Sequence, residues 1–321
     1  MKFDWPKGIA KNNSIVSIFI IGFLLYPLLT NLYLTDMMSR ALIMGLFALS
    51  LDLLWGYTGV LSLGHAAFFG LGSYTCVLIL KHVHAFNPSH LSLIAAVLFP
   101  VILALIIGFL TFLSKTTEIY FAIITLAVSL LFEKIVVIWY AFTGGSNGII
   151  NIPFFNFSIP GVFEFELNNS VRYYYAILGI CLVVFFFCRK LVHSPFGKVL
   201  IAIRENEQRT AVIGYNTNKY KIMIYCISAG ISGLCGAMFG PLNEIVYPGL
   251  MGLILSAEVL VWVAVGGRGT LWGAFLGAVS IKIIENLLSD ISIVMYLIVL
   301  GLIFILVVLF LPKGIAGLLQ K

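Results

Sequence analysis

The sequence predicts an all-α protein, a polytopic transmembrane helical bundle of eight to ten spans, with ten preferred. Hydrophobic residues make up 61% of the 321 residues, charged residues only 10%, and the mean hydropathy is +1.09. A soluble domain is about one quarter charged. A membrane-spanning helix needs roughly 20 mostly apolar residues, so about ten spans fit in this chain. The composition excludes a disordered, collagenous or nucleic-acid-binding chain and argues against a soluble enzyme.

The expected spans follow the apolar runs between polar breaks, in chain order. The first begins near Ile15 and is too long for the apolar core of a signal peptide. The eighth span is short, and the glycine-rich break at 55–64 is typical of a re-entrant piece. The number of spans could therefore be as low as eight. The expected spans are 15–35, 37–54, 65–81, 91–113, 119–140, 173–190, 220–240, 252–265, 270–288 and 292–311.

The distribution of lysine and arginine predicts the orientation of these spans. The segment 189–221 holds seven of the nineteen basic residues. With ten spans, this segment, the basic residues near both termini and Lys115 lie on one side of the membrane, which the positive-inside rule identifies as the cytoplasm. The opposite side receives the loop 143–172, which has Glu164, Glu166 and only Arg172. We therefore expect both termini in the cytoplasm.

Glycines cluster in two stretches, 56–64 and 266–278. Non-helical backbone at membrane depth survives only where protein or a water-filled cavity satisfies its amides, and paired glycine interruptions in a transporter indicate the solute path. Glycines also allow helices to pack closely. Close packing is the favoured interpretation for 273–278, whereas both interpretations stay open for 56–64.

Six ionisable residues fall inside expected spans, where a charge is costly and indicates a functional candidate. Lys282 and Glu285 are three residues apart and can form a local ion pair, which favours a structural role. Asp52 and Glu258 could stabilise the ends of broken helices or contact a solute. The complete set is Asp52, Glu133, Lys134, Glu258, Lys282 and Glu285. His82, His84 and His90 have no acidic or cysteine partner nearby, so we expect a solvated loop and no metal site there.

An amphipathic helix is expected at 194–214 on the cytoplasmic side. Ser194 followed by Pro195 starts it and Gly214 stops it. Small and apolar residues recur at helical spacing between them, with charged residues around the rest of the helix. Such a helix could rest on the lipid interface or lie in a groove of a cytoplasmic partner.

At this point the sequence resembles the membrane subunits of bacterial ABC importers for branched-chain amino acids and for urea. The resemblance runs from about residue 40 to residue 318, and the order and spacing of its motifs make it specific. The motifs are GYTGVLSLGHAAFF at 56–69, YFAIITLA at 120–127, TGGSNG at 143–148, SPFGK at 194–198 followed by AIRENE at 202–207, and LPKG at 311–314. WVAVGGRGTLWGA at 262–274 and DLLWGYTG at 52–59 look most like the urea-importer permease, although the chain is somewhat short for that branch.

The resemblance implies roles for two sets of residues. In the family, the segment that corresponds to 194–214 is a coupling helix that docks on the ATPase, with the candidates Phe196, Gly197, Ala202, Arg204, Glu205, Asn206, Glu207, Ala211 and Gly214. The solute path is expected along 56–65, Thr125 and 143–148, which offer hydroxyls, amides and backbone groups, with the candidates Gly59, Ser62, Gly64, His65, Thr125, Thr143, Ser146 and Asn147.

We therefore expect residues 1–321 to form one transmembrane domain of a binding-protein-dependent importer in the bacterial inner membrane. Its solute is expected to be small and neutral or zwitterionic, urea first and branched-chain amino acids second. The implied partners are a second homologous permease subunit, two cytoplasmic ATPase subunits and a periplasmic solute-binding protein. The chain holds no G-x-x-x-x-G-K-[ST] loop, so we expect no cofactor here and ATP use by the partners. The alternative is an ion-coupled secondary transporter that uses Asp52, Glu133 or Glu258.

Overall fold

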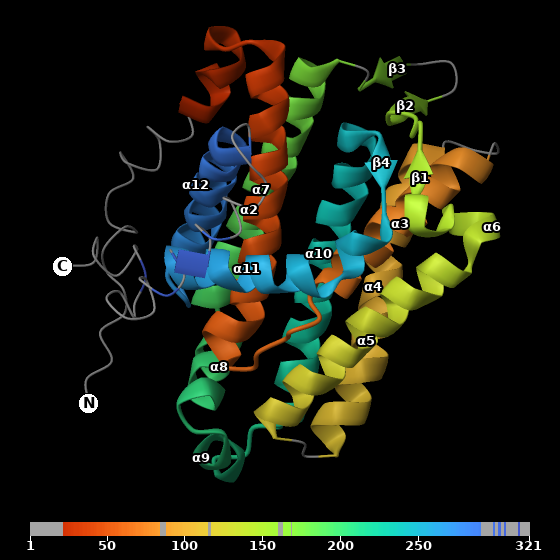
Figure 1. Ribbon diagram of the computed structural model, residues 1–321. Coiled ribbons are helices and arrows are strands. Elements are labelled where there is room, and N and C mark those ends of the chain that lie inside the picture. The colour runs from red at the N-terminus through yellow and green to blue at the C-terminus, as the bar shows by residue number, and fades with distance from the viewer. Residues whose placement is uncertain are drawn as a thin grey trace.

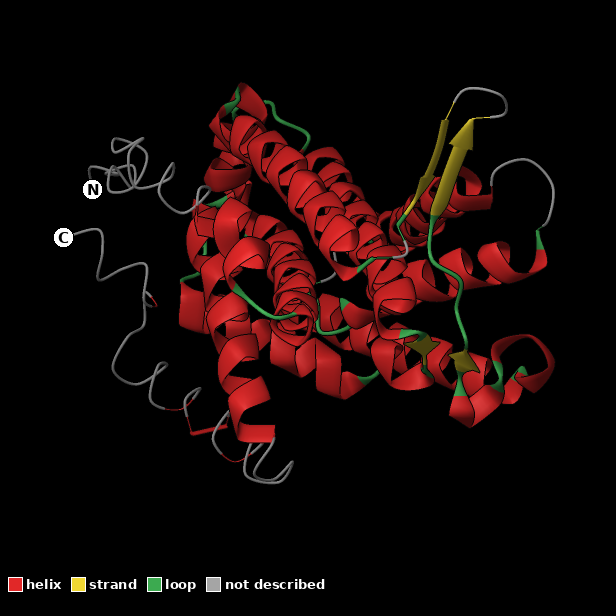
Figure 2. Ribbon diagram, turned by 90° about the horizontal axis from the view of Figure 1, so that it is seen from above, coloured by secondary structure: helices red, strands yellow, loops and turns green. Residues whose placement is uncertain are grey.

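The computed structural model describes residues 22–83, 88–114, 117–159, 163–167 and 169–289, with the single residues 298, 301, 302, 305 and 314. Its described part is a bundle of helices (Figures 1 and 2). Five of these helices are long and apolar enough to cross a membrane. They are α2 (Leu32–Thr58), α4 (Pro88–Leu113), α5 (Glu118–Ile138), α7 (Ser170–His193) and α10 (Thr217–Asn243). The all-α membrane class expected from composition is confirmed.

Three further apolar helices complete the bundle. The helix α3 (Ala66–His82) has 17 residues, and α11 (Leu253–Gly266) is followed by α12 (Leu271–Ser289). A bend of 119° separates α11 from α12. Gly267 and Gly269 in the turn between them have positive φ values of 116° and 76°, a region that glycine enters without a steric penalty.

The two ends of the bundle carry different small elements (Figure 1). The helices α8 (Pro195–Glu205) and α9 (Glu207–Val212) lie at one end, called here the α8–α9 end. The strands lie toward the other, called here the strand end. Strand β1 (Ile149–Ile150) pairs antiparallel with β4 (Ile245–Val246), and β2 (Asn156–Ile159) pairs antiparallel with β3 (Phe163–Glu166). The short helices α6 (Tyr140–Thr143) and η1 (Gly145–Asn147) follow α5 and lead into β1, whereas η2 (Pro248–Met251) lies inside the bundle against α3 and α5.

The core surrounds α2 and α10. In α2, 89% of the most apolar window is buried, against 28% in α5. The helix α2 packs against α7, α10, α11 and α12, while α10 also packs against α3 and α4. A Cβ at Gly72 of α3 would overlap the backbone of Gly233 in α10. Small residues of this kind let helix backbones approach closely in a membrane, and this contact sets the α3–α10 spacing.

Some expected span boundaries were wrong. The break placed at residue 36 is absent, because α2 runs without interruption through Asp36. The interruption lies instead at Thr30 and Asn31, where residues 22–29 end their helix and the extended Asn31 precedes α2. The carboxylate of Asp36 breaks no backbone hydrogen bond, so α2 continues through it. The count of ten spans stays a prediction, because residues 15–21 of the first expected span and nearly all of the span expected at 292–311 lie outside the described residues, as do Lys115, His84 and both termini.

Candidate functional site

The segment 194–214 forms two helices, so the expectation of one helix was wrong. Asn206 breaks it, since its backbone is extended, with φ −162° and ψ 101°. Its side-chain oxygen accepts a hydrogen bond of 2.8 Å from the amide of Arg209 and thereby caps α9. Asparagine competes for backbone hydrogen bonds in this way and favours caps over helix interiors. The expected ends hold: Ser194 precedes α8, and Gly214 has a φ of 103° beyond α9.

One face of α8 is packed into the bundle. Val199, Leu200 and Ile203 are buried, and α8 lies against α2 and α7. A Cβ at Gly197 would overlap the carbonyl of Val192, so glycine permits the tight turn from α7 into α8. Phe196 stacks on Tyr220 at 5.3 Å between ring centroids. Phe196 and Gly197, both coupling candidates, therefore attach the segment to the bundle.

Two coupling candidates with charged side chains are also held within the chain. The guanidinium of Arg204 donates a hydrogen bond of 2.5 Å to the carbonyl of Gly56, near the end of α2. Glu207 at the start of α9 forms an ion pair of 2.5 Å with Lys221 of α10. A hydrogen bond from a charged donor is roughly twice as strong as a neutral one. These contacts connect α8 and α9 directly to α2 and α10.

The turn between α11 and α12 joins the same network. The amide of Gly269 donates a hydrogen bond of 2.6 Å to the buried carboxylate of Asp52 in α2. Arg268 donates one of 3.2 Å to the carbonyl of Trp55 and lies 4.9 Å from the centroid of the Trp55 ring. Asp52 thus stabilises the turn at a broken helix, one of the two roles considered for it.

The opposite face of the segment is open. Ala202, Glu205, Asn206 and Ala211 are exposed. The neighbouring Val212 and Ile213 are 88% and 70% exposed, and they were absent from the sequence-based candidates. Their signal was visible as consecutive apolar residues directly before the stop at Gly214. Together, Ala202, Ala211, Val212 and Ile213 form a patch that we call the docking patch.

The pathway candidates Ser62, Gly64 and His65 lie inside the bundle and not on an open surface. Ser62 and His65 are fully buried. A Cβ at Gly64 would overlap the carbonyl of Thr125 in α5, and the Thr125 hydroxyl accepts a hydrogen bond of 3.2 Å from the amide of Leu63. A protein group thus satisfies the Leu63 amide of the broken segment, as non-helical backbone at membrane depth requires. At Gly64 the structure favours close packing. Gly59 lies at the α8–α9 end, 3.4 Å from a side-chain carbon of Arg204, measured from an ideal Cβ.

His65 connects three helices. Its Nε2 lies 2.9 Å from the hydroxyl of Ser50 in α2 and 3.5 Å from that of Ser228 in α10. The Ser228 hydroxyl also donates a hydrogen bond to the carbonyl of Ser50. The imidazole stacks on Phe47 at 5.5 Å between ring centroids. This polar cluster inside an apolar core holds α2, α3 and α10 in register.

The remaining pathway candidates lie far from 59–65. The hydroxyl of Thr143 donates hydrogen bonds to the carbonyls of Val136 and Trp139 and shapes the end of α5, while Ser146 and Asn147 are exposed. From Thr125 to the end of α5 at Ile138 the helix rises about 20 Å. The structure therefore brings Leu63, Gly64 and Thr125 together but not the 143–147 group.

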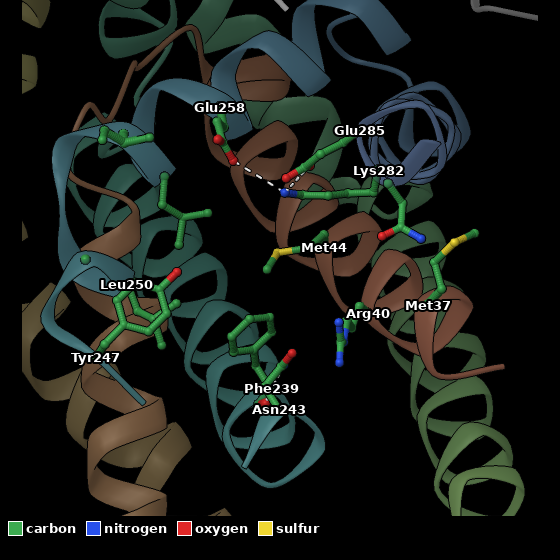
Figure 3. Close-up of a pocket in the computed structure, with 14 residues that line it drawn as sticks. Met37, Arg40, Met44, Phe239, Asn243, Tyr247, Leu250, Glu258, Lys282 and Glu285 are labelled. Atoms are coloured by element: carbon green, nitrogen blue, oxygen red, sulfur yellow. Dashed lines mark hydrogen bonds and ion pairs between the residues drawn. The ribbon is translucent and has the colours of Figure 1, made fainter. Parts of the chain in front are cut away.

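A cavity of about 380 Å³ lies between α2, α10, η2, α11 and α12 (Figure 3). We call it the charged cavity, because Arg40 of α2, Glu258 of α11, and Lys282 and Glu285 of α12 line it. The ammonium of Lys282 is 2.5 Å from Glu285 and 3.5 Å from Glu258. The local pair expected from the spacing is confirmed, and Glu258 joins it across the bend. None of the eight pathway candidates lines this cavity.

Other chemistries have little support in the described part of the chain. No group of three or more histidine, cysteine, aspartate or glutamate residues there could hold a metal ion. The five cysteines are free, and all except Cys226 are buried, which is typical of cysteines that serve as small hydrophobic residues.

Comparisons with known proteins give one consistent result. A family model described as branched-chain amino acid transport system / permease component matches residues 33–308. The high-affinity branched-chain amino acid transport system permease protein LivM of Salmonella typhimurium is 25% identical over 313 residues, which cover 90% of this chain and 71% of the relative. LivH of the same organism is 22% identical over 305 residues, covering 89% and 96%. The ribose import permease protein RbsC of Haemophilus influenzae is 28% identical over 112 residues, covering 33% and 34%. No solved structure matches.

Proposed function

Because the chain belongs to the family of branched-chain amino acid transport system permease components, we propose that it forms one half of the pore of a bacterial importer for branched-chain amino acids. Its relatives are permease subunits of ABC transporters, which are not themselves enzymes. The chain is therefore a multi-pass membrane permease that works with ATPase and binding-protein partners. The observation that carries the proposal is the family match over residues 33–308.

The proposed assembly has two different permease subunits, two cytoplasmic ATPases and one periplasmic binding protein in the inner membrane. The chain is similar to both LivM and LivH of one organism, which supports pairing with a homologous second permease. In this assembly residues 1–321 are one transmembrane domain, the α8–α9 end and both termini face the cytoplasm, and the partners use ATP while this chain binds no cofactor. The basic residues in 189–221 support this orientation.

Branched-chain amino acids are the preferred solutes. The relatives reported above are named for branched-chain amino acids or ribose, so the urea assignment suggested by the motifs at 52–59 and 262–274 gains no support from them. Arg268 and Trp55, two residues that suggested urea, interact with each other at the α11–α12 turn. A structural role thus accounts for them.

Coupling to ATP would pass through the docking patch. A groove of the ATPase would bind the open face of α8 and α9 through the four residues of the docking patch, Ala202, Ala211, Val212 and Ile213. Movement of the ATPases then displaces α8, whose contact from Arg204 to Gly56 transmits the displacement to the end of α2. Alternating access follows as α2 and its neighbours tilt. The solute-path role of 59–65 and Thr125 stays a prediction, and it requires that this buried segment open in another state of the cycle.

The alternative, an ion-coupled secondary transporter, is not favoured by the family. Two of its candidate carboxylates also have structural partners, since Asp52 accepts from Gly269 and Glu258 pairs with Lys282. Uptake of labelled leucine and labelled urea, side by side in proteoliposomes with all partner subunits, tests the proposal. We expect ATP-dependent leucine uptake that uncouplers do not abolish. Urea uptake without leucine uptake, or uptake that needs an ion gradient and no ATP, would refute it.

A further inference from the structure

The charged cavity combines four charged side chains with apolar ones such as Met44 and Leu250. Three of the charged residues, Glu258, Lys282 and Glu285, are at most partly exposed, and charges at membrane depth are costly without a partner or a function. Glu258, Glu285 and Lys282 form one group, whose formal charges sum to −1 − 1 + 1 = −1. The ammonium of Lys282 also lies 4.8 Å from the centroid of the Trp262 ring. This group therefore keeps one negative charge in excess, at the junction of α11 and α12.

Arg40 supplies the opposite charge on another wall of the cavity. It lines the cavity from α2 and is exposed, and no hydrogen bond or ion pair joins its guanidinium to another residue within the described ranges. In the view of Figure 3, Met44 lies between Arg40 and the ammonium of Lys282, and Phe239 adds a further apolar side chain to the lining. The lining thus has a positive site, an apolar middle and a negative site, and its net charge is zero.

This pattern matches one class of solute. A zwitterionic amino acid carries an anionic carboxylate and a cationic ammonium, and a net-neutral pair of separated charges complements it. Met44, Phe239, Leu250 and Leu255 line the cavity and offer apolar surface to an aliphatic side chain. A volume of about 380 Å³ lies at the small end of the range for ligand sites, about 300–1,000 Å³.

The position of the cavity agrees with this use. Met44 lies 14 residues before Thr58, so the helical rise places it about 21 Å from the α8–α9 end of α2, and Arg40 lies about 27 Å from that end. The cavity is therefore nearer the strand end, which faces the binding protein in the proposed orientation. A solute released by that protein meets this end first.

From these observations we propose that the charged cavity is a binding site for branched-chain amino acids, in which Arg40 binds the carboxylate and Glu258, with Glu285, binds the ammonium. This inference rests on the proposed function and adds the residues that recognise the solute. An ion pair that only stabilises the α11–α12 bend would account for Lys282, Glu258 and Glu285. It would not account for the position of Arg40, which lines the same cavity from α2.

Binding of tritiated leucine to the purified complete complex in nanodiscs, without the binding protein, tests the site. We expect saturable binding that Arg40→Gln weakens about tenfold or more, because a hydrogen bond from a charged donor to the carboxylate is lost. Glu258→Gln should also weaken leucine binding. Arg189→Gln on α7, which does not line the cavity, is the matched control and should bind leucine like the wild type.

Two analogues separate the two halves of the site. Leucinamide, which lacks the carboxylate, should compete equally well in the wild type and in Arg40→Gln, but less well in Glu258→Gln. Isocaproate, which lacks the ammonium, should show the reverse. Gel filtration and basal ATP hydrolysis verify that each variant complex is assembled.

Two results would overturn the inference. One is equal leucine binding by the wild type, Arg40→Gln and Glu258→Gln. The other is no binding at millimolar leucine to a wild-type complex that imports leucine with its binding protein, and this result leaves the proposed function intact. Failure of that complex to import leucine at all would instead refute the proposed function.

Discussion

Charges placed in the docking patch should remove the ATPases and leave the permease folded. Ala202→Asp and Ala211→Arg change side chains that are exposed in the single chain, and exposed substitutions usually alter the free energy of unfolding by less than about 0.5 kcal/mol. In a groove that holds the patch, each new charge becomes buried without a partner. Such a charge weakens binding of the ATPase by about 3 to 5 kcal/mol. This raises the dissociation constant of the ATPase by a factor of roughly 100 to 3,000.

The assay is co-purification. A tag on the permease recovers the complex from detergent, the ratio of ATPase to permease is measured, and leucine-stimulated hydrolysis follows in proteoliposomes with the binding protein. We expect both variants to insert but to lose the ATPases and leucine uptake together. Ala141→Arg in α6, an exposed position at the strand end, is the matched control and should retain them.

A helix that only rests on lipid predicts a different outcome. The variants would then shift the depth of α9 in the interface while the ATPases stay bound. Normal ATPase stoichiometry with normal leucine-stimulated hydrolysis in both variants would therefore refute the docking role. The basic residues of 189–221 would in that case serve topology alone.

Three further predictions concern assembly and stability, each measured by thermal unfolding of the purified complex. Gly64→Leu should prevent assembly or lower the free energy of unfolding by well above 1 kcal/mol, because the new side chain overlaps the carbonyl of Thr125 in α5. Gly179→Leu on α7, where nothing lies within 4 Å of a Cβ, is the control and should be tolerated. Equal stability of the two variants would contradict the packing role of Gly64. Asp52→Ala should lower the free energy of unfolding by about 1 to 3 kcal/mol, since the part-buried Gly269 amide loses its acceptor. Asp52→Asn should recover part of this loss. An unchanged unfolding midpoint in both variants would show that this hydrogen bond is dispensable. Lys282→Met should lower the free energy of unfolding by about 3 to 5 kcal/mol, because the carboxylates of Glu258 and Glu285 lose their cation. Changing both glutamates to glutamine in the Lys282→Met chain should restore stability. No restoration would mean that the Lys282 side chain stabilises the bundle by packing alone.

Local patterns in the sequence were sufficient for the class and for several landmarks. Composition alone predicted an all-α membrane protein, because only helices with internally satisfied backbones can use so many apolar residues in lipid. The helix start at Ser194 and the stop at Gly214 were predicted because caps depend on a few neighbouring residues. The pair Lys282–Glu285 was predicted because one helical turn brings the two side chains together. The resemblance to the permeases of branched-chain amino acid importers was confirmed by the match over residues 33–308, whereas the urea branch that the motifs favoured was not.

Other features required the tertiary structure, because they join residues far apart in the chain. Asp52 meets Gly269 across 217 positions, and Arg204 meets Gly56 across 148. Asn206 could either continue one helix or cap a second one. Which of the two satisfies more backbone hydrogen bonds depends on the surrounding structure, and local helix propensity does not decide it. His65 was expected on the solute path, but packing buries it between α2, α3 and α10.

The charged cavity shows the same difference between what the sequence predicts and what only the tertiary structure decides. The sequence by itself determined that Glu258, Lys282 and Glu285 are ionisable residues at membrane depth, where each needs a partner or a function. Only the 119° bend between α11 and α12 brings Glu258 within 3.5 Å of Lys282. Only the packing of α2 beside α12 places Arg40 on the same cavity. Periodicity specifies which side of a helix is apolar, whereas the choice of neighbouring helix depends on the shape of every interface in the bundle.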